Sequence, residues 1–206
     1  MSKIAVDVVL LPGEEVTRRA IEANTELIKK AGRKIVLSKE NCLPHISLAM
    51  GCIDRNDIEA ISKVLERIAI EYAAEAAKLS ITGVHITTNS VGEKVSAFIV
   101  EKTKGLQLLH EKVMKTLKPY LSYDVSADMI YGTEQVADST LLWIRNYPDK
   151  SSFENFLPHI TIGYGETEPI ESPMSFTASR LALCHLGNHC TCRQILVSVE
   201  FDGPPE

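Results

Sequence analysis

Two histidines, each followed at the second position by a hydroxyl residue, lie in nearly identical segments of this sequence. Residues 43–51 read Leu-Pro-His-Ile-Ser-Leu-Ala-Met-Gly, and residues 157–165 read Leu-Pro-His-Ile-Thr-Ile-Gly-Tyr-Gly. The two histidines, His45 and His159, are separated by more than half of the chain. A repeat at this separation indicates a duplicated protein in which each half contributes one copy of the motif.

The spacing within each motif predicts which side chains lie together. Alternate residues of a β-strand share one face. The predicted faces therefore group His45 with Ser47 and Ala49, and His159 with Thr161 and Gly163. Because the third residue is small in both motifs, we expect an open shelf for a ligand beside the imidazole and the hydroxyl.

Two imidazoles and two hydroxyls in one groove are suited to acid–base chemistry on a phosphodiester. One neutral histidine removes a proton from the attacking water or hydroxyl, and the other, as imidazolium, protonates the leaving oxygen; each transfer contributes about 10²–10⁴ to the rate. Histidine is the side chain whose ordinary pKa allows both forms near neutrality. Ser47 and Thr161 would donate hydrogen bonds to the non-bridging phosphate oxygens. This chemistry requires neither a metal nor a cofactor.

The rest of the chain alternates between strand and helix patterns. Strands are predicted at 3–11, 44–53, 79–87, 94–101, 158–165, 175–186 and 190–201. Helices are predicted at 14–31, from Asp54 to about Ala77, at 104–118, and at 139–147 with its end at Pro148. Residues 120–140 carry no clear pattern. These elements predict an α/β or α+β fold with a mostly antiparallel sheet.

Paired His-x-Ser/Thr motifs, one in each half of a chain of 206 residues, resemble those of the two-histidine (2H) phosphoesterase superfamily. The resemblance implies one bilobal domain over residues 1–206. Its two pseudo-symmetric lobes would each place an antiparallel sheet, with helices on its outer face, beside a central groove. The implied activity is metal-independent hydrolysis or reversible ligation of 2′,3′-cyclic phosphate or 2′-5′ phosphodiester bonds. By motif position, His45 and His159 would be the acid–base pair, and Ser47 and Thr161 the phosphate-binding hydroxyls.

Composition and charge limit the partners that we expect. The net charge of −5 argues against a broad basic face for long duplex nucleic acid but not against a short anionic ligand. The resemblance implies RNA ends or small cyclic nucleotides as partners. No stretch approaches the roughly 18 apolar residues of a membrane helix, so no membrane contact is expected. The five cysteines, without a secretory signal before them, are expected to be free thiols in the cytoplasm.

Two other histidine-containing segments have a different interpretation. His85-Ile86-Thr87 has the motif spacing but no preceding Leu-Pro, so we interpret His85 as an ordinary strand histidine. Residues 184–192 hold three cysteines and two histidines and are predicted to form a hairpin that turns at Gly187-Asn188. That turn would pair Cys184 with Thr191 and Leu183 with Cys192. The cysteines would then not converge on a metal, although a metal-dependent interaction site is the alternative interpretation.

A second class of function remains open from the sequence. A binding module would use the same groove to recognise an RNA end or a nucleotide phosphate without turnover. Side chains that could add positive charge or stacking are Lys3, Arg145, Arg180, Arg193, Tyr131 and Tyr164, and none of them is assigned to the site. Strand alternation places Tyr164 on the face opposite His159, which counts against it.

Overall fold

The protein folds into two antiparallel sheets of four strands each, in a computed structural model that describes residues 3–89, 92–132, 135–170 and 173–201. The first sheet has the strand order β2-β1-β7-β8 and the second the order β5-β4-β3-β6. The strands are β1 (Lys3–Pro12), β2 (Ile46–Asp54), β3 (Leu79–Thr88), β4 (Lys94–Val100), β5 (His159–Tyr164), β6 (Met174–Phe176), β7 (Ala178–Gly187) and β8 (Thr191–Glu200). The α+β fold class predicted from the sequence is confirmed.

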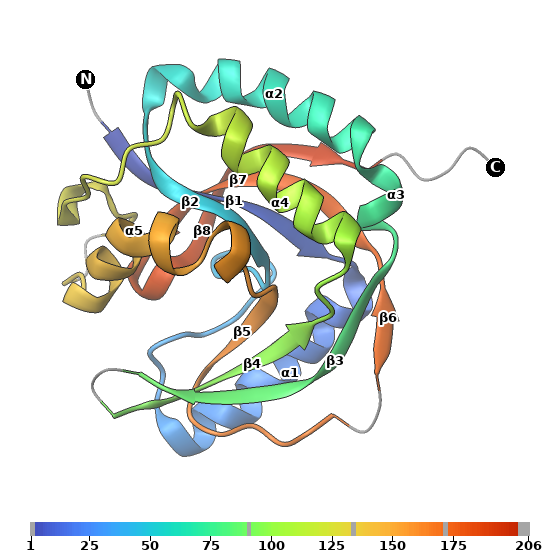
Figure 1. Cartoon of the computed structure of the whole chain (residues 1–206). Coiled ribbons are helices and arrows are strands. Elements are labelled where there is room, and N and C mark those ends of the chain that lie inside the picture. Colours follow the sequence, from blue (N-terminus) through green and yellow to red (C-terminus); the bar gives the residue numbers. More distant parts are fainter. Residues whose placement is uncertain (1–2, 90–91, 133–134, 171–172, 202–206) are drawn as a thin grey trace.

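The helices surround these sheets (Figure 1). They are α1 (Glu14–Ala31), α2 (Ile58–Glu71), α3 (Ala73–Ala76), α4 (Lys104–Leu117) and α5 (Asp138–Lys150). Short 3₁₀ segments are η1 (Arg55–Asp57), η2 (Ala127–Met129), η3 (Phe153–Asn155) and η4 (Asn188–Cys190). Among the described residues, no helix is long and apolar enough to cross a membrane.

The two sheets repeat one topology. In each, the motif strand is the edge strand, β2 in the first sheet and β5 in the second, and its neighbour in the sheet is β1 or β4. The two motif strands contact each other (Figure 1). The bilobal arrangement therefore brings the two halves of the repeat together at the edges of their sheets.

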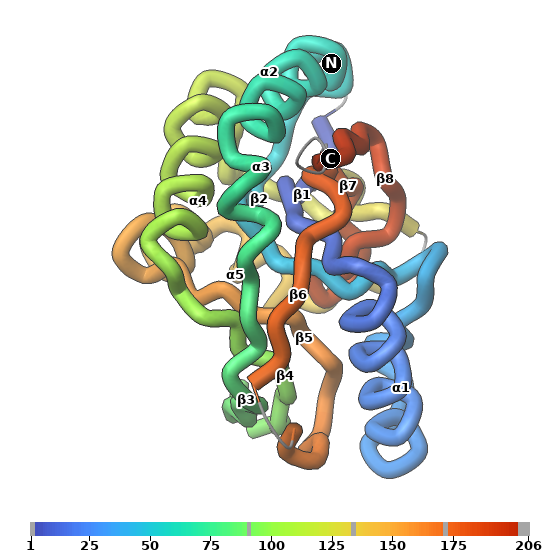
Figure 2. The backbone as a smooth tube through the Cα atoms, turned by 90° about the vertical axis from the view of Figure 1, so that its right-hand side faces the viewer, coloured from blue at the N-terminus to red at the C-terminus, as the bar shows by residue number. Residues whose placement is uncertain are grey.

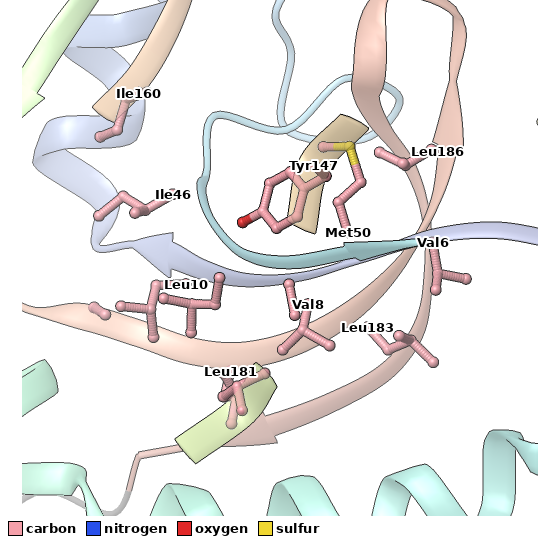
Figure 3. Packing of buried hydrophobic residues seen from close by; sticks show 14 of the residues in the cluster. Val6, Val8, Leu10, Ile46, Met50, Tyr147, Ile160, Leu181, Leu183 and Leu186 are labelled. Carbon is pink, nitrogen blue, oxygen red and sulfur yellow. The ribbon is translucent and has the colours of Figure 1, made fainter. Parts of the chain in front are cut away.

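Each motif strand is packed against the helix of the other half. α1 follows β1 in the chain but contacts β5, and α4 follows β4 but contacts β2. Figure 2 shows α1 on one side of the molecule and α4 with α2 on the other. The buried residues of both halves form one cluster, in which Leu10 and Ile46 lie near Ile160 (Figure 3). This exchange of helices fixes the two sheets relative to each other through a shared core.

Three predicted elements differ from the observed ones. The helix predicted from Asp54 to about Ala77 is divided into η1, α2 and α3, and the Asp54 side chain accepts a hydrogen bond from the Asn56 amide in η1. α5 continues through Pro148 to Lys150, so the proline does not end it. The strand predicted at 175–186 is two strands, because the chain passes from the second sheet (β6) to the first (β7).

The hairpin at residues 184–192 turns later than predicted. β7 ends at Gly187, and three residues of η4 lead into β8, with His189 and Cys190 at φ values of 58° and 54°. The longer turn changes the register, so that Cys192 pairs with Leu186 and not with Leu183.

The new register brings two cysteines together. The Cα atoms of Cys184 and Cys192 are 5.5 Å apart, and the two residues form a disulfide. The expectation of five free thiols is therefore wrong for this pair, whereas Cys42, Cys52 and Cys190 are free. Within the described ranges, no group of three or more His, Cys, Asp and Glu side chains is arranged to hold a metal ion.

Candidate active site

Each motif strand contains a β-bulge at the same motif position. The third residue after the histidine has no register partner in the neighbouring strand: Leu48 in β2 and Ile162 in β5. One extra residue reverses the alternation of the side chains that follow. Ala49 and Gly163 therefore lie on the face opposite the motif hydroxyls, where the sequence prediction placed them beside the hydroxyls.

The predicted open shelf is consequently absent at these two positions. Ala49 is fully buried. A Cβ atom on Gly163 would lie 3.0 Å from Asn24 Nδ2 and 3.3 Å from Leu27 Cδ2 of α1, so this glycine allows the helix to pack closely on β5. Its φ of 151° is also a backbone conformation that favours glycine.

The bulges bring Met50 and Tyr164 onto the motif face instead. Tyr164 pairs with Val95, which shares its face with Ala97 and therefore with Thr161. The prediction that Tyr164 lies opposite His159 is thus wrong, and the bulge is the reason. The Tyr164 hydroxyl lies 3.2 Å from His189 Nδ1.

Buried side chains from the exchanged helices bind the bulge carbonyls. His110 of α4 donates from Nδ1 to the Leu48 carbonyl over 2.7 Å and accepts at Nε2 from the Phe153 amide. Asn24 of α1 donates from Nδ2 to the Ile162 carbonyl over 2.8 Å. A bulge leaves backbone groups without strand partners, and burial makes such groups costly. The two side chains therefore stabilise the bulges that shape the motif strands.

The two motif histidines have the same ring orientation. His45 Nδ1 lies 2.7 Å from the Leu43 carbonyl, and His159 Nδ1 lies 2.8 Å from the Leu157 carbonyl. A carbonyl can only accept, so Nδ1 carries the hydrogen and Nε2 is the acceptor of the neutral ring. The intervening proline has a fixed φ and restricts the preceding leucine to extended conformations. The repeated Leu-Pro-His tripeptide thus presents Nε2 in both motifs.

The electrostatic surroundings keep both imidazoles neutral. Burial lowers the pKa of His45 to about 4, and a charge on His159 would lower it further. Burial also lowers the pKa of His159. Ile46 and Ile160, the residues that follow the two histidines, lie near each other in the shared core (Figure 3), and β2 contacts β5. The two rings therefore lie in one region of the molecule. The sequence prediction had placed them in one groove.

The family model described as the 2′-5′ RNA ligase superfamily matches residues 37–186, a range that includes both motifs. The chain belongs to this superfamily. It is also similar to the crystal structure of TT0787 of Thermus thermophilus, with a TM-score of 0.60 and 15% sequence identity over 96% of this chain and 98% of that one. At this identity the similarity shows the fold. No curated protein matches the sequence.

A third histidine lies on the motif face in this member of the superfamily. His85 of β3 pairs with Ala97 of β4, which in turn pairs with Thr161, so the three residues share one face of the second sheet. His85 is exposed, and its charge would lower the pKa of His159. His85 is a strand histidine, as interpreted from the sequence, but which residues share its face was not predicted. Its place depends on the register of three strands, which the local sequence does not show.

A buried carboxyl lies beside the first motif. Asp7 of β1 is fully buried, and its Oδ2 atom is 3.9 Å from His45 Nε2. Burial raises the pKa of Asp7 to about 8, and the nearby Ser47 hydroxyl and Ala49 amide offset this rise only in part. No role for Asp7 was predicted from the sequence. A charged residue in the middle of an otherwise apolar strand is the signal that could have revealed it.

The basic and aromatic candidates have other contacts. Lys3 Nζ donates to Ser122 Oγ over 3.0 Å, and Arg145 donates to the Val125 carbonyl over 3.3 Å. Tyr131 packs edge-to-face on His185 with 5.2 Å between ring centroids. Arg193 Nε is buried and has no hydrogen-bond partner among the described residues. Arg180 lines a cavity of about 460 Å³ that also reaches Leu43 and Pro44, next to His45.

Proposed function

We propose that this protein is a metal-independent phosphoesterase that hydrolyses, or reversibly ligates, 2′,3′-cyclic phosphate or 2′-5′ phosphodiester bonds of RNA ends or nucleotides. Membership of the 2′-5′ RNA ligase superfamily supports phosphoesterase or ligase-like activity. The observation that carries the proposal is the matched orientation of two imidazoles, each with Nδ1 on a leucine carbonyl and Nε2 available for proton transfer. Residues 1–206 act as one bilobal domain in this proposal.

The reaction needs one base and one acid on opposite sides of the phosphorus atom. The neutral imidazole takes a proton from water at Nε2 as the water oxygen forms a bond to phosphorus. The imidazolium gives its Nε2 proton to the leaving oxygen as the bond from that oxygen to phosphorus breaks. His45 and His159 supply these two groups, and Ser47 and Thr161 hold the non-bridging oxygens.

The direct test is hydrolysis of 2′,3′-cyclic AMP in the presence of EDTA by the wild type and by His45→Ala and His159→Ala. Each variant should lose at least about 10³-fold in kcat, within the range that a proton-transfer group contributes. His85→Ala is the matched control, since it is the same substitution on the same sheet face outside the motifs, and we expect it to stay within about tenfold of the wild type.

Folding of each variant is checked by circular dichroism. A folded His45→Ala or His159→Ala protein that hydrolyses the cyclic nucleotide as fast as the wild type contradicts the proposal. Saturable nucleotide binding by the wild type with no product after long incubation also contradicts it, and favours the binding module.

A further inference from the structure

Asp7 lies in an apolar environment near the middle of β1. Its strand neighbours on the two sides are Met50 of β2 and Cys184 of β7, and Cys184 is part of the disulfide. Neither carboxyl oxygen has a well-formed hydrogen bond among the residues that the structure describes, although Ser47 and Ala49 lie near enough to stabilise its charge in part. Burial of a carboxyl without such a bond costs several kcal/mol when it is ionised, so the group is neutral at rest or has a functional reason to be present.

His45 is the imidazole that the structure places within reach of this carboxyl. The separation of 3.9 Å between Asp7 Oδ2 and His45 Nε2 lies just outside hydrogen-bond range, so a small ring movement closes it. The other titratable groups that face Asp7 are Tyr147 of α5, which packs beside Met50 (Figure 3), and Cys190 of η4. Burial raises the pKa of both, so the phenol and the thiol stay neutral and do not compete for the proton.

The second half has no equivalent of this carboxyl at the matching described position. In β2, Met50 is the second residue after the bulge residue Leu48, and it pairs with Asp7. In β5, Tyr164 is the second residue after the bulge residue Ile162, and it pairs with Val95. A valine thus occupies the position beside the second motif that an aspartate occupies beside the first. Two otherwise matched imidazoles therefore differ in whether they have a neighbouring proton donor at this position.

We propose that Asp7 stores the proton that His45 delivers to the leaving oxygen, which makes His45 the general acid and His159 the general base. This inference rests on the proposed phosphoesterase function. Asp7 acts through His45 and does not touch the substrate, so it is a positioning residue.

The proton balance closes with one proton on the Asp7–His45 pair. At rest, Asp7 carries it and both imidazoles are neutral. When the phosphodiester anion binds, the Oδ2–H bond of Asp7 breaks and an Nε2–H bond of His45 forms. The His45 ring then turns its Nε2–H bond from Asp7 toward the leaving oxygen and protonates that oxygen, while His159 takes a proton from water. The proton on His159 returns to Asp7 through solvent after the phosphate monoester leaves.

The pKa directions agree with this resting state. Burial raises the pKa of Asp7 to about 8 and lowers that of His45 to about 4, so at pH 7 the proton resides on the carboxyl. A bound phosphate anion stabilises the imidazolium, and the ionised carboxylate that remains stabilises it further. Both effects favour transfer to His45 only while the substrate is present.

The test is the pH dependence of kcat for Asp7→Asn, which keeps the shape of the carboxyl but holds no titratable proton. In the wild type, activity should fall above about pH 8 as the pair loses its proton. In the variant, His45 must hold the proton alone, so this alkaline limb should move by more than about one pH unit toward acid. At pH 7.5 we expect about a 10²-fold loss in kcat with KM within about threefold.

Val95→Ala is the matched control, because Val95 has the same register position beside the second motif, and its pH profile should follow the wild type. An Asp7→Asn protein that keeps the wild-type kcat and alkaline limb overturns the inference. If His45→Ala and His159→Ala are inactive in the same assays, the proposed function survives that result. An inactive wild type, in contrast, removes the proposed function itself.

A second measurement does not depend on activity or on the folding of a variant. The Asp7 carboxyl carbon of the wild type can be titrated by ¹³C NMR. A midpoint near pH 8 supports the inference, and a midpoint near the ordinary value of 3.8 overturns it.

Discussion

The half of the molecule that holds His45 and the half that holds His159 have the same construction but different surroundings. Both have a Leu-Pro-His segment that orients the ring, a bulge after the hydroxyl, and a helix from the opposite half that binds the bulge carbonyl. They differ in the side chain beside the imidazole, which is Asp7 in the first half and Val95 in the second. The second imidazole instead has His85 near it.

The comparison separates what the repeated motif supplies from what the neighbouring side chains supply. A duplicated motif gives two equivalent imidazoles, but hydrolysis of a phosphodiester needs one acid and one base. Asp7 beside His45 holds a proton at neutral pH, whereas a positive charge on His85 would lower the pKa of His159, so the two neighbours affect the two rings differently. In our proposal, the asymmetry of the neighbours, and not of the motifs, divides the acid and base roles between the two histidines.

The largest expected effect is on the free energy of unfolding, and it arises from Asp7 in the first half. Asp7 titrates at its ordinary value of 3.8 when unfolded and at about 8 when folded, so the folded state loses stability as the pH rises between these values. At pH 7 this costs about 4 kcal/mol, and Asp7→Asn removes the cost. Urea unfolding should show the variant increasingly more stable than the wild type from pH 4 to pH 8, and a difference that does not change with pH would refute this.

The next largest effect is expected at the bulge of the second half, at Ile162. Asn24 binds the Ile162 and Ile35 carbonyls and accepts from the Leu37 amide. Asn24→Ala leaves these buried groups without partners and should cost about 3 kcal/mol of unfolding free energy. Thr25→Ala, on the exposed side of the same helix, is the control and should change it by less than about 0.5 kcal/mol. Equal costs for the two substitutions would show that the bulge carbonyl does not depend on Asn24.

The motif hydroxyls should contribute equally in the two halves. Ser47→Ala and Thr161→Val each remove one hydrogen-bond donor to a charged phosphate oxygen. We expect kcat/KM for the cyclic nucleotide to fall by about tenfold in either variant, in line with about 1.5 kcal/mol for such a bond. Steady-state kinetics measures both, and a loss confined to one variant would mean that the two hydroxyls do not bind the same phosphate.

The smallest effect concerns His85. A positive charge on His85 would lower the pKa of His159, so His85→Ala should raise that pKa. A base with a higher pKa is protonated earlier as the pH falls, so the acidic limb of the kcat profile should move to higher pH by less than about one unit. A shift in the opposite direction would contradict the placement of His85 beside the second motif.

The sequence predicted what depends on local pattern. The motifs, the strands that carry them and the amphipathic helices α1 and α4 follow from residue spacing within one element. The bulges at Leu48 and Ile162 could not be predicted from the spacing, because both residues look like ordinary inward-facing apolar residues of a strand. The positions of Tyr164 and Cys192 were predicted wrongly, and that of His85 was not predicted, because each depends on the register between paired strands.

The most direct test of the central claim, that the two motif imidazoles act on one phosphate, is an NMR titration of the wild type with adenosine 2′-monophosphate. We predict that the ring signals of His45 and His159 shift along one common saturation curve, with His45 protonated and His159 neutral at pH 7 in the complex. Shifts at only one ring, or two curves with different affinities, would contradict it.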